Sequence, residues 1–180
     1  MSLAARLSRG ETLGDRIIKV NHAGEHGAVC IYTAQRWFAR WRAPEMLAEI
    51  DGFIAHEKSH RASFAAELDK RGRGRCRSYW FCGIGGFALG AVTGLAGRDA
   101  IAATTVAIER VVLRHMRGQI EELEGNDPPA VGALRRIIAE EQEHHDLSTA
   151  RIAADSAWSR LLEPIVSVST ETVIWLGMRL

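Results

Sequence analysis

The sequence predicts an all-α protein built on a four-helix bundle with two additional apolar helices. Along four stretches, apolar positions recur at alternating spacings of three and four residues, the pattern of one helix face. Two of these stretches carry a Glu-x-x-His string, Glu57 to His60 and Glu141 to His144. On a helix, each string places a carboxylate and an imidazole one turn apart on the same face. Strand and hairpin signals are few, so the bundle is the favoured architecture.

The spacing of two further glutamates indicates a duplicated metal site. Glu25 precedes Glu57 by 32 residues, and Glu109 precedes Glu141 by 32 residues. The two halves repeat at an offset of 84 and give six candidate ligands: Glu25, Glu57, His60, Glu109, Glu141 and His144. One Glu from each of two helices, with a Glu-x-x-His from each of the other two, is the ligand set of a ferritin-like dimetal carboxylate site.

Length and composition are those of one globular domain. The chain has 180 residues, of which 47% are hydrophobic and 25% charged, and its net charge is +1. This charge balance gives no general attraction to nucleic acid, and no nucleic-acid partner is expected. Three sparse cysteines predict free thiols in a reducing compartment. Residues 1–14 lack an apolar signal core, so we expect a flexible N-terminus before a single domain over residues 15–180.

Four helices are expected to carry the candidate ligands. The first runs from about Asp15, as its N-cap, to about Arg42; the second follows Pro44; the fourth begins near Asp99; and the fifth follows Asp127. Their expected inner faces are Ile18, His22, Glu25, Val29 and Tyr32; Ile50, Phe53, Glu57, His60 and Phe64; Ala102, Thr105, Glu109, Val112 and Met116; and Leu134, Ile137, Glu141, His144 and Ser148. A carboxylate at such a position is strongly disfavoured unless it is paired or binds metal.

Between the two halves, residues 70–97 form a basic and then apolar segment. Lys70 to Arg77 carries five positive charges, and residues 79–97 carry no charge. The apolar part is long enough for a membrane span, but a single span would put Glu57 and Glu109 on opposite sides of the bilayer. We therefore expect a third helix that is either buried or at the membrane interface, where the basic run would contact anionic lipid. A solvated loop leading into a core helix is the alternative.

Small and aromatic residues mark how the two additional helices pack. Gly86, Gly90 and Gly94 recur every four residues, which permits close contact between helices. The last helix is expected over about residues 157–180. Its Trp158 and Trp175 either anchor at a lipid–water boundary or fill the core.

Four carboxylates and two imidazoles suit two iron or manganese ions better than zinc. By the symmetry of the repeat, we expect Glu57 and Glu141 to bridge the ions and Glu25 and Glu109 to be terminal ligands. A reduced di-iron site can pass two electrons to O₂. The candidate partners that would orient the two imidazoles are His22, His115, His145 and Asp146.

Several strings resemble one family, the demethoxyubiquinone hydroxylases of ubiquinone biosynthesis. They are residues 21–28 (NHAGEHGA) followed by Ile31 and Tyr32, residues 86–93 (GFALGAVT), residues 105–109 (TVAIE) and residues 140–146 (EEQEHHD). The similarity runs from about Asp15 to the C-terminus. It implies a ferritin-like di-iron monooxygenase that hydroxylates the ring of demethoxyubiquinone with O₂ and electrons from NADH.

The resemblance also implies a location and partners. The enzyme would be a peripheral protein on the reducing face of a membrane, and the polyprenyl tail would enter through an apolar channel walled by residues 79–97 and the last helix. An accessory lipid-binding protein would present the substrate. Two departures, His26 and Met116 where the family often has Tyr, leave the reductant, the rate and the exact quinone open.

Two other functions compete with this interpretation. A ferritin-like iron-handling or peroxide-reducing protein would share the ligand set, but it needs no lipid channel. A non-enzymatic membrane scaffold with a structural metal would show no turnover with O₂.

Overall fold

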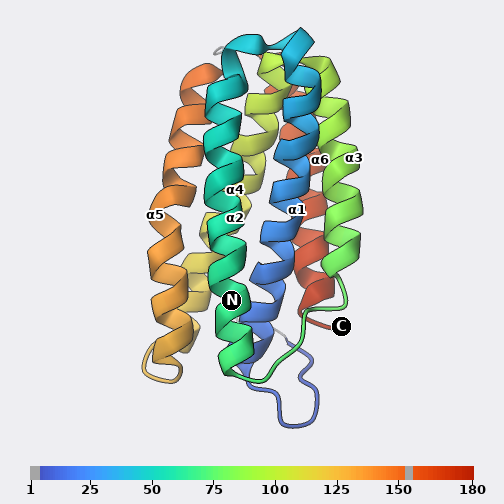
Figure 1. Cartoon of the computed structure of the whole chain (residues 1–180). Coiled ribbons are helices and arrows are strands. Elements are labelled where there is room, and N and C mark those ends of the chain that lie inside the picture. The colour runs from blue at the N-terminus through green and yellow to red at the C-terminus, as the bar shows by residue number, and fades with distance from the viewer. Residues whose placement is uncertain (1–4, 153–155) are drawn as a thin grey trace.

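The computed structural model describes residues 5–152 and 156–180 and confirms the all-α prediction. Within these residues there are six α-helices and no strand. They are α1 (Leu13–Arg42), α2 (Leu47–Lys70), α3 (Tyr79–Ala96), α4 (Arg98–Leu123), α5 (Pro128–Arg151) and α6 (Ala157–Gly177), with a short 3₁₀ helix, Pro44–Met46, before α2. All six run roughly parallel to one axis (Figure 1).

The bundle consists of α1, α2, α4 and α5, and the other two helices are added along one side. Helix α3 packs along α1, and α6 packs along α4 (Figure 1). Every expected inner-face residue is buried except Val112, which is partly buried. Apolar clusters lie above and below the glutamates: in α1, one cluster ends at Ala23, another begins at Ile31, and Glu25 lies between them.

The N-cap of the first helix lies three residues earlier than expected. Thr12, and not Asp15, is its N-cap: the Thr12 Oγ1 atom accepts from the Asp15 amide at 3.1 Å. The Asp15 carboxylate in turn accepts from the Thr12 amide at 3.0 Å. This reciprocal capping box satisfies two backbone donors and places Asp15 inside the first turn.

Helix α3 approaches α1 closely because its contact face is made of glycine. A Cβ atom at Gly86 would overlap the Gly27 carbonyl, and one at Gly90 would overlap the Ile31 carbonyl. The predicted close packing is thus confirmed. The opposite face of α3 is apolar and exposed: Trp80, Phe81, Ile84, Phe87, Val92 and Leu95.

Helix α6 repeats this two-sided pattern. Leu162 and Val166 are buried, whereas Leu161, Ile165 and Val168 are exposed. Trp175 is 54% exposed and Trp158 is 37% exposed, so neither fills the core. Among the described residues, α3 alone is long and apolar enough to cross a membrane by length and composition, and it is partly buried against the bundle.

Two arginines of the basic segment are held in place by carboxylates of the bundle. Arg71 donates to both Asp127 oxygens at 2.7 and 2.8 Å and to Glu67 at 2.8 Å. Arg73 donates to Asp15 at 2.9 Å. These two arginines close one end of the bundle by joining the α2–α3 loop to the starts of α1 and α5.

Candidate metal centre

The structure brings the six predicted ligands together in the middle of the bundle. Glu25 comes from α1, Glu57 and His60 from α2, Glu109 from α4, and Glu141 and His144 from α5; every one is at most 5% exposed. They form two groups, each with one potential ligand atom per residue and all such atoms within 4.8 Å of one another. The groups are Glu25, Glu57, His60 and Glu141, and Glu57, Glu109, Glu141 and His144. Glu57 and Glu141 belong to both groups.

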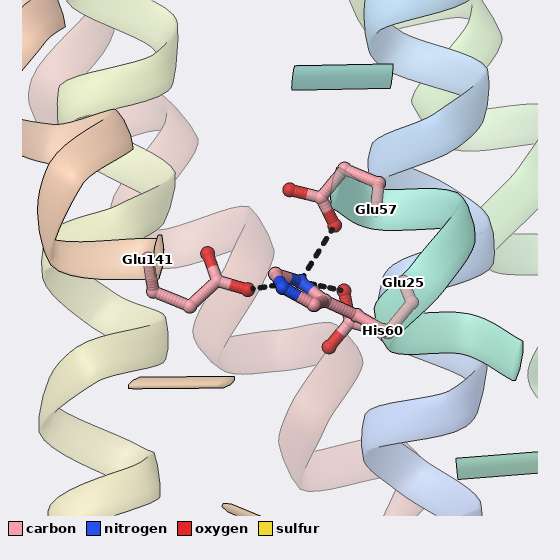
Figure 2. Close-up of side chains that lie close together, drawn as sticks. All are labelled: Glu25, Glu57, His60 and Glu141. Atoms are coloured by element: carbon pink, nitrogen blue, oxygen red, sulfur yellow. Dashed lines mark ion pairs between the residues drawn. The ribbon is translucent and has the colours of Figure 1, made fainter. Parts of the chain in front are cut away.

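Both imidazoles point the Nδ1 atom into the carboxylate cluster. The His60 Nδ1 atom lies 3.0 Å from Glu141 and 3.9 Å from both Glu25 and Glu57 (Figure 2). The His144 Nδ1 atom lies 3.3 Å from Glu57 and 3.7 Å from Glu141. The two halves of the repeat therefore present the same imidazole atom to the same pair of carboxylates.

Burial makes the charged forms of these carboxyls costly. Burial, followed by the nearby charges of Glu57 and Glu141, raises the pKa of Glu25 well above its usual range. Burial and Glu141 do the same to the pKa of Glu109, and burial and Glu57 raise the pKa of Glu141 to about 8. For Glu57, burial is outweighed by His144, Glu25 and His60, and its pKa is lowered.

The buried donor atoms fit divalent cations. Both carboxylate oxygens of Glu57 and the Nδ1 atoms of His60 and His144 have no hydrogen-bond partner. Buried polar atoms are normally paired, and an unpaired set converging on one point is a typical signature of an ion site. Four carboxylates would offset the charge of two divalent ions, and oxygen-rich ligands with two imidazoles suit iron or manganese.

Two residues that the sequence analysis missed contact the outer edges of the imidazoles. The His60 Nε2 atom lies 2.8 Å from Glu140 Oε2. The His144 Nε2 atom lies 3.0 Å from His56 Nδ1, and the two rings are stacked with 5.3 Å between centroids. The repeat itself contained a signal for them, because each immediately precedes one of the shared glutamates.

The four residues predicted to orient the imidazoles lie elsewhere, which corrects that expectation. His115 pairs with Glu171 at 2.8 Å, and His145 pairs with its neighbour Asp146 at 3.0 Å. His22 stacks on Tyr79, and burial together with Arg61 lowers its pKa to about 4. Among the ligand carboxylates, Glu109 accepts a hydrogen bond from the Tyr32 hydroxyl at 2.8 Å.

The two positions that depart from the family pattern have defined surroundings. His26 stacks on Tyr79 with 4.0 Å between centroids and an angle of 2° between planes, and Arg61 donates to its Nδ1 atom at 3.2 Å. Met116 is fully buried in the apolar cluster below the glutamates.

A cavity of about 410 Å³ connects the carboxylate cluster to the two additional helices. All four ligand glutamates line it, together with Phe81 and Leu89 of α3, Ile108 and Val112 of α4, and Ile165, Val173 and Ile174 of α6. Its few polar side chains besides the ligands include Asn21, His115 and Gln119, and Asn21 donates to Gln119 at 2.9 Å. A mostly apolar cavity of this size that ends at charged groups suits an organic molecule with a polar head.

Comparison with known proteins finds relatives over most of the chain. Residues 12–177 match the family model described as "Ubiquinone biosynthesis protein COQ7". The 3-demethoxyubiquinol 3-hydroxylase of Rhodospirillum rubrum is 32% identical over 167 residues, which cover 92% of this chain and 77% of that protein.

Two eukaryotic relatives are named NADPH-dependent 3-demethoxyubiquinone 3-hydroxylase, mitochondrial. The one from Homo sapiens is 35% identical over 173 residues, covering 92% of this chain and 77% of that protein. The one from Dictyostelium discoideum is 33% identical over 174 residues, covering 92% and 76%. The chain therefore belongs to the COQ7 family of ubiquinone biosynthesis proteins.

Proposed function

We propose that this protein is a di-iron monooxygenase that hydroxylates the ring of a demethoxyubiquinone-type quinone with O₂ and a reduced nicotinamide nucleotide. The observation that carries the proposal is the apolar cavity whose wall includes all four ligand glutamates. The names of the relatives indicate the reaction and the substrate class. The name of the Dictyostelium relative specifies NADPH, whereas the resemblance implied NADH, so both nucleotides are candidate electron sources.

The chain's own residues hold the ions and shape the space beside them. Glu25, Glu57, His60 and Glu141 would hold one ion, and Glu57, Glu109, Glu141 and His144 the other. When bound, two ferrous ions would supply electrons that reduce O₂, and O₂ would be the source of the oxygen atom that enters the ring. The cavity walls would exclude water and orient the quinone, and Asn21, Gln119 and His115 could bond its ring oxygens.

We also propose that the protein is peripheral to a membrane and that the polyprenyl tail leaves the cavity between α3 and α6. Both helices contribute cavity residues and also present exposed apolar faces. Exposed Arg75 and Arg77 lie at the start of α3, where cations would meet anionic headgroups. The reducing face of the membrane and the accessory lipid-binding protein remain predictions.

A turnover assay tests the function. Apo-protein loaded anaerobically with two ferrous equivalents receives O₂, a short-chain demethoxyquinone and either NADH or NADPH. The expected result is hydroxylated quinone, with oxygen from ¹⁸O₂ in the new hydroxyl. Oxidation of iron or consumption of peroxide without hydroxylated quinone would support the iron-handling or peroxide-reducing alternative instead.

A further inference from the structure

The duplicated site is asymmetric at the pair of positions that contact the two imidazoles. His56 and Glu140 are separated by the same offset of 84 that relates the six ligands. Each precedes a shared glutamate, and each contacts the imidazole of the opposite half: Glu140 contacts His60, and His56 contacts His144. The repeat thus keeps the geometry of the contact and changes its chemistry.

Geometry dictates which atom donates in each contact. If the Nδ1 atom of an imidazole is a metal ligand, its proton must be on Nε2. His60 then donates to a carboxylate, and His144 donates to the Nδ1 atom of a neutral imidazole. A hydrogen bond to a carboxylate is roughly twice as strong as one between neutral groups. It also gives the imidazole more electron density, which makes it a stronger ligand.

We propose that Glu140 and His56 are positioning residues that make the two ion positions unequal, with tighter binding at the position of His60 than at that of His144. This rests on the proposed dimetal site and deepens it. Glu57 and Glu141 are common to both groups and do not create this difference. The Tyr32 hydroxyl donates to Glu109, and the equivalent position beside Glu25 is Met116; this bond draws electron density from Glu109 and acts in the same direction, because Glu109 belongs to the His144 group.

The two positioning residues are accessible on the side of the cluster away from the cavity. Their side chains are 39% and 44% exposed, and the His56 Nδ1 atom lies 4.0 Å from the Glu140 carboxylate. Substitutions there alter groups at the rim of the core and leave the six buried ligands in place. This makes the asymmetry testable without removing a ligand.

The experiment titrates anaerobic apo-protein with Co²⁺ and follows heat and visible absorption. The native protein is expected to bind two ions in two distinct steps. Glu140→Gln should weaken the tighter step by about 10–100-fold, the usual loss for such partners of metal ligands. His56→Glu, which gives both imidazoles a carboxylate partner, should tighten the weaker step and bring the two steps closer together. Glu143→Gln and Lys58→Gln, at exposed positions on the same helices, are matched controls that should change neither step.

Proton NMR of the Co²⁺-loaded protein gives a readout that a general loss of stability does not move. Two exchangeable, strongly shifted imidazole N–H signals are expected, and Glu140→Gln should displace only one of them. Two equal binding steps in the native protein, or equal effects of Glu140→Gln on both, would overturn the asymmetry while leaving the dimetal site intact. Failure of the native protein to bind Co²⁺ and Fe²⁺ would instead reject the proposed function, and the asymmetry with it.

Discussion

The carboxylate cluster has two contrasting sides. Toward α3 and α6 lies an apolar cavity whose walls continue into exposed apolar helix faces. Toward α2 and α5 lie His56 and Glu140, both half-exposed and hydrogen-bonded to the imidazoles. A single centre is thus open to an organic molecule on one side and supported by polar groups near solvent on the other.

The difference shows how one bundle separates two tasks. Apolar walls favour a ring and its tail and keep water out, but they cannot orient an imidazole. Polar partners orient the imidazoles, but they would be costly to bury in the wall of an apolar cavity. Placing the two sets on opposite sides of the same six ligands satisfies both requirements.

The largest expected effect comes from removing a ligand that both sides share. Glu141→Ala should abolish binding of both ions, because Glu141 belongs to both groups, and hydroxylation should fall to background. Metal content after anaerobic loading, measured by elemental analysis, checks this. Glu143→Ala is the control, since that side chain lies on the same helix, two residues after Glu141, but is exposed. Full occupancy by two ions in Glu141→Ala would show that the ligand assignment is wrong.

A change on the outer apolar face should affect membrane binding and leave the ion site alone. The double substitution Ile84→Glu and Phe87→Glu puts two charges on side chains that are 72% and 54% exposed. Because each apolar side chain contributes about 1.5–3 kcal/mol when fully buried, vesicle binding should weaken at least about tenfold. Sedimentation with anionic vesicles measures this. Ala55→Glu, at an exposed position of α2, is the control. Unchanged sedimentation would mean that this face does not contact lipid.

A change on the face of α3 that contacts α1 should weaken the packing of these two helices and lower the thermal stability. Gly90→Ala introduces a Cβ atom against the Ile31 carbonyl of α1, and overpacking of this kind costs about 1–3 kcal/mol. In a protein of this size the Tm should fall by about 2–4 °C for each kcal/mol. Gly85→Ala, where an added Cβ meets no atom within 4 Å, should instead stabilise α3 by up to about 1 kcal/mol. Equal Tm changes for the two variants would contradict the close packing of α3.

The smallest expected effect concerns Glu11, which lies just before the start of α1. Burial opposes the charge on Glu11, but hydrogen bonds from Lys19, the Ser8 amide and Arg16 lower its pKa to about 2. Since the ordinary value is 4.5, the charged carboxylate adds stability that is complete above about pH 4.5 and lost as the pH falls toward 2. Glu11→Gln should therefore lower the Tm by a few degrees at pH 7.

Thermal unfolding at several pH values checks this linkage. The Tm difference between the native protein and Glu11→Gln should shrink steadily below pH 4.5 and vanish near pH 2. Exposed Glu45→Gln is the control. A difference that stays constant with pH would assign the loss to packing and not to the charge.

The sequence by itself determined the elements of the fold and the six candidate ligands. Helical periodicity is local, so the stripes carrying Glu25, Glu57, Glu109 and Glu141 could be read directly, and only Val112 is less buried than its stripe predicts. The offset of 84 linked the halves because duplicated helices present equivalent residues to one shared core. The spacing of glycines in α3 likewise predicted its close contact with α1.

Only the tertiary structure decided which residues surround the ligands. Glu140 and His56 reach imidazoles more than 75 residues away in sequence, and their contacts depend on the relative rotation of α2 and α5. In the sequence, Arg71 and Arg73 belong to a run of basic residues. In the structure, Arg71 pairs with Asp127 and Arg73 pairs with Asp15. The cavity, too, exists only because α3 and α6 lie beside the bundle, where Phe81 and Ile165 form part of its wall while remaining partly exposed. Periodicity identifies an apolar face, but the neighbouring helices determine what that face contacts.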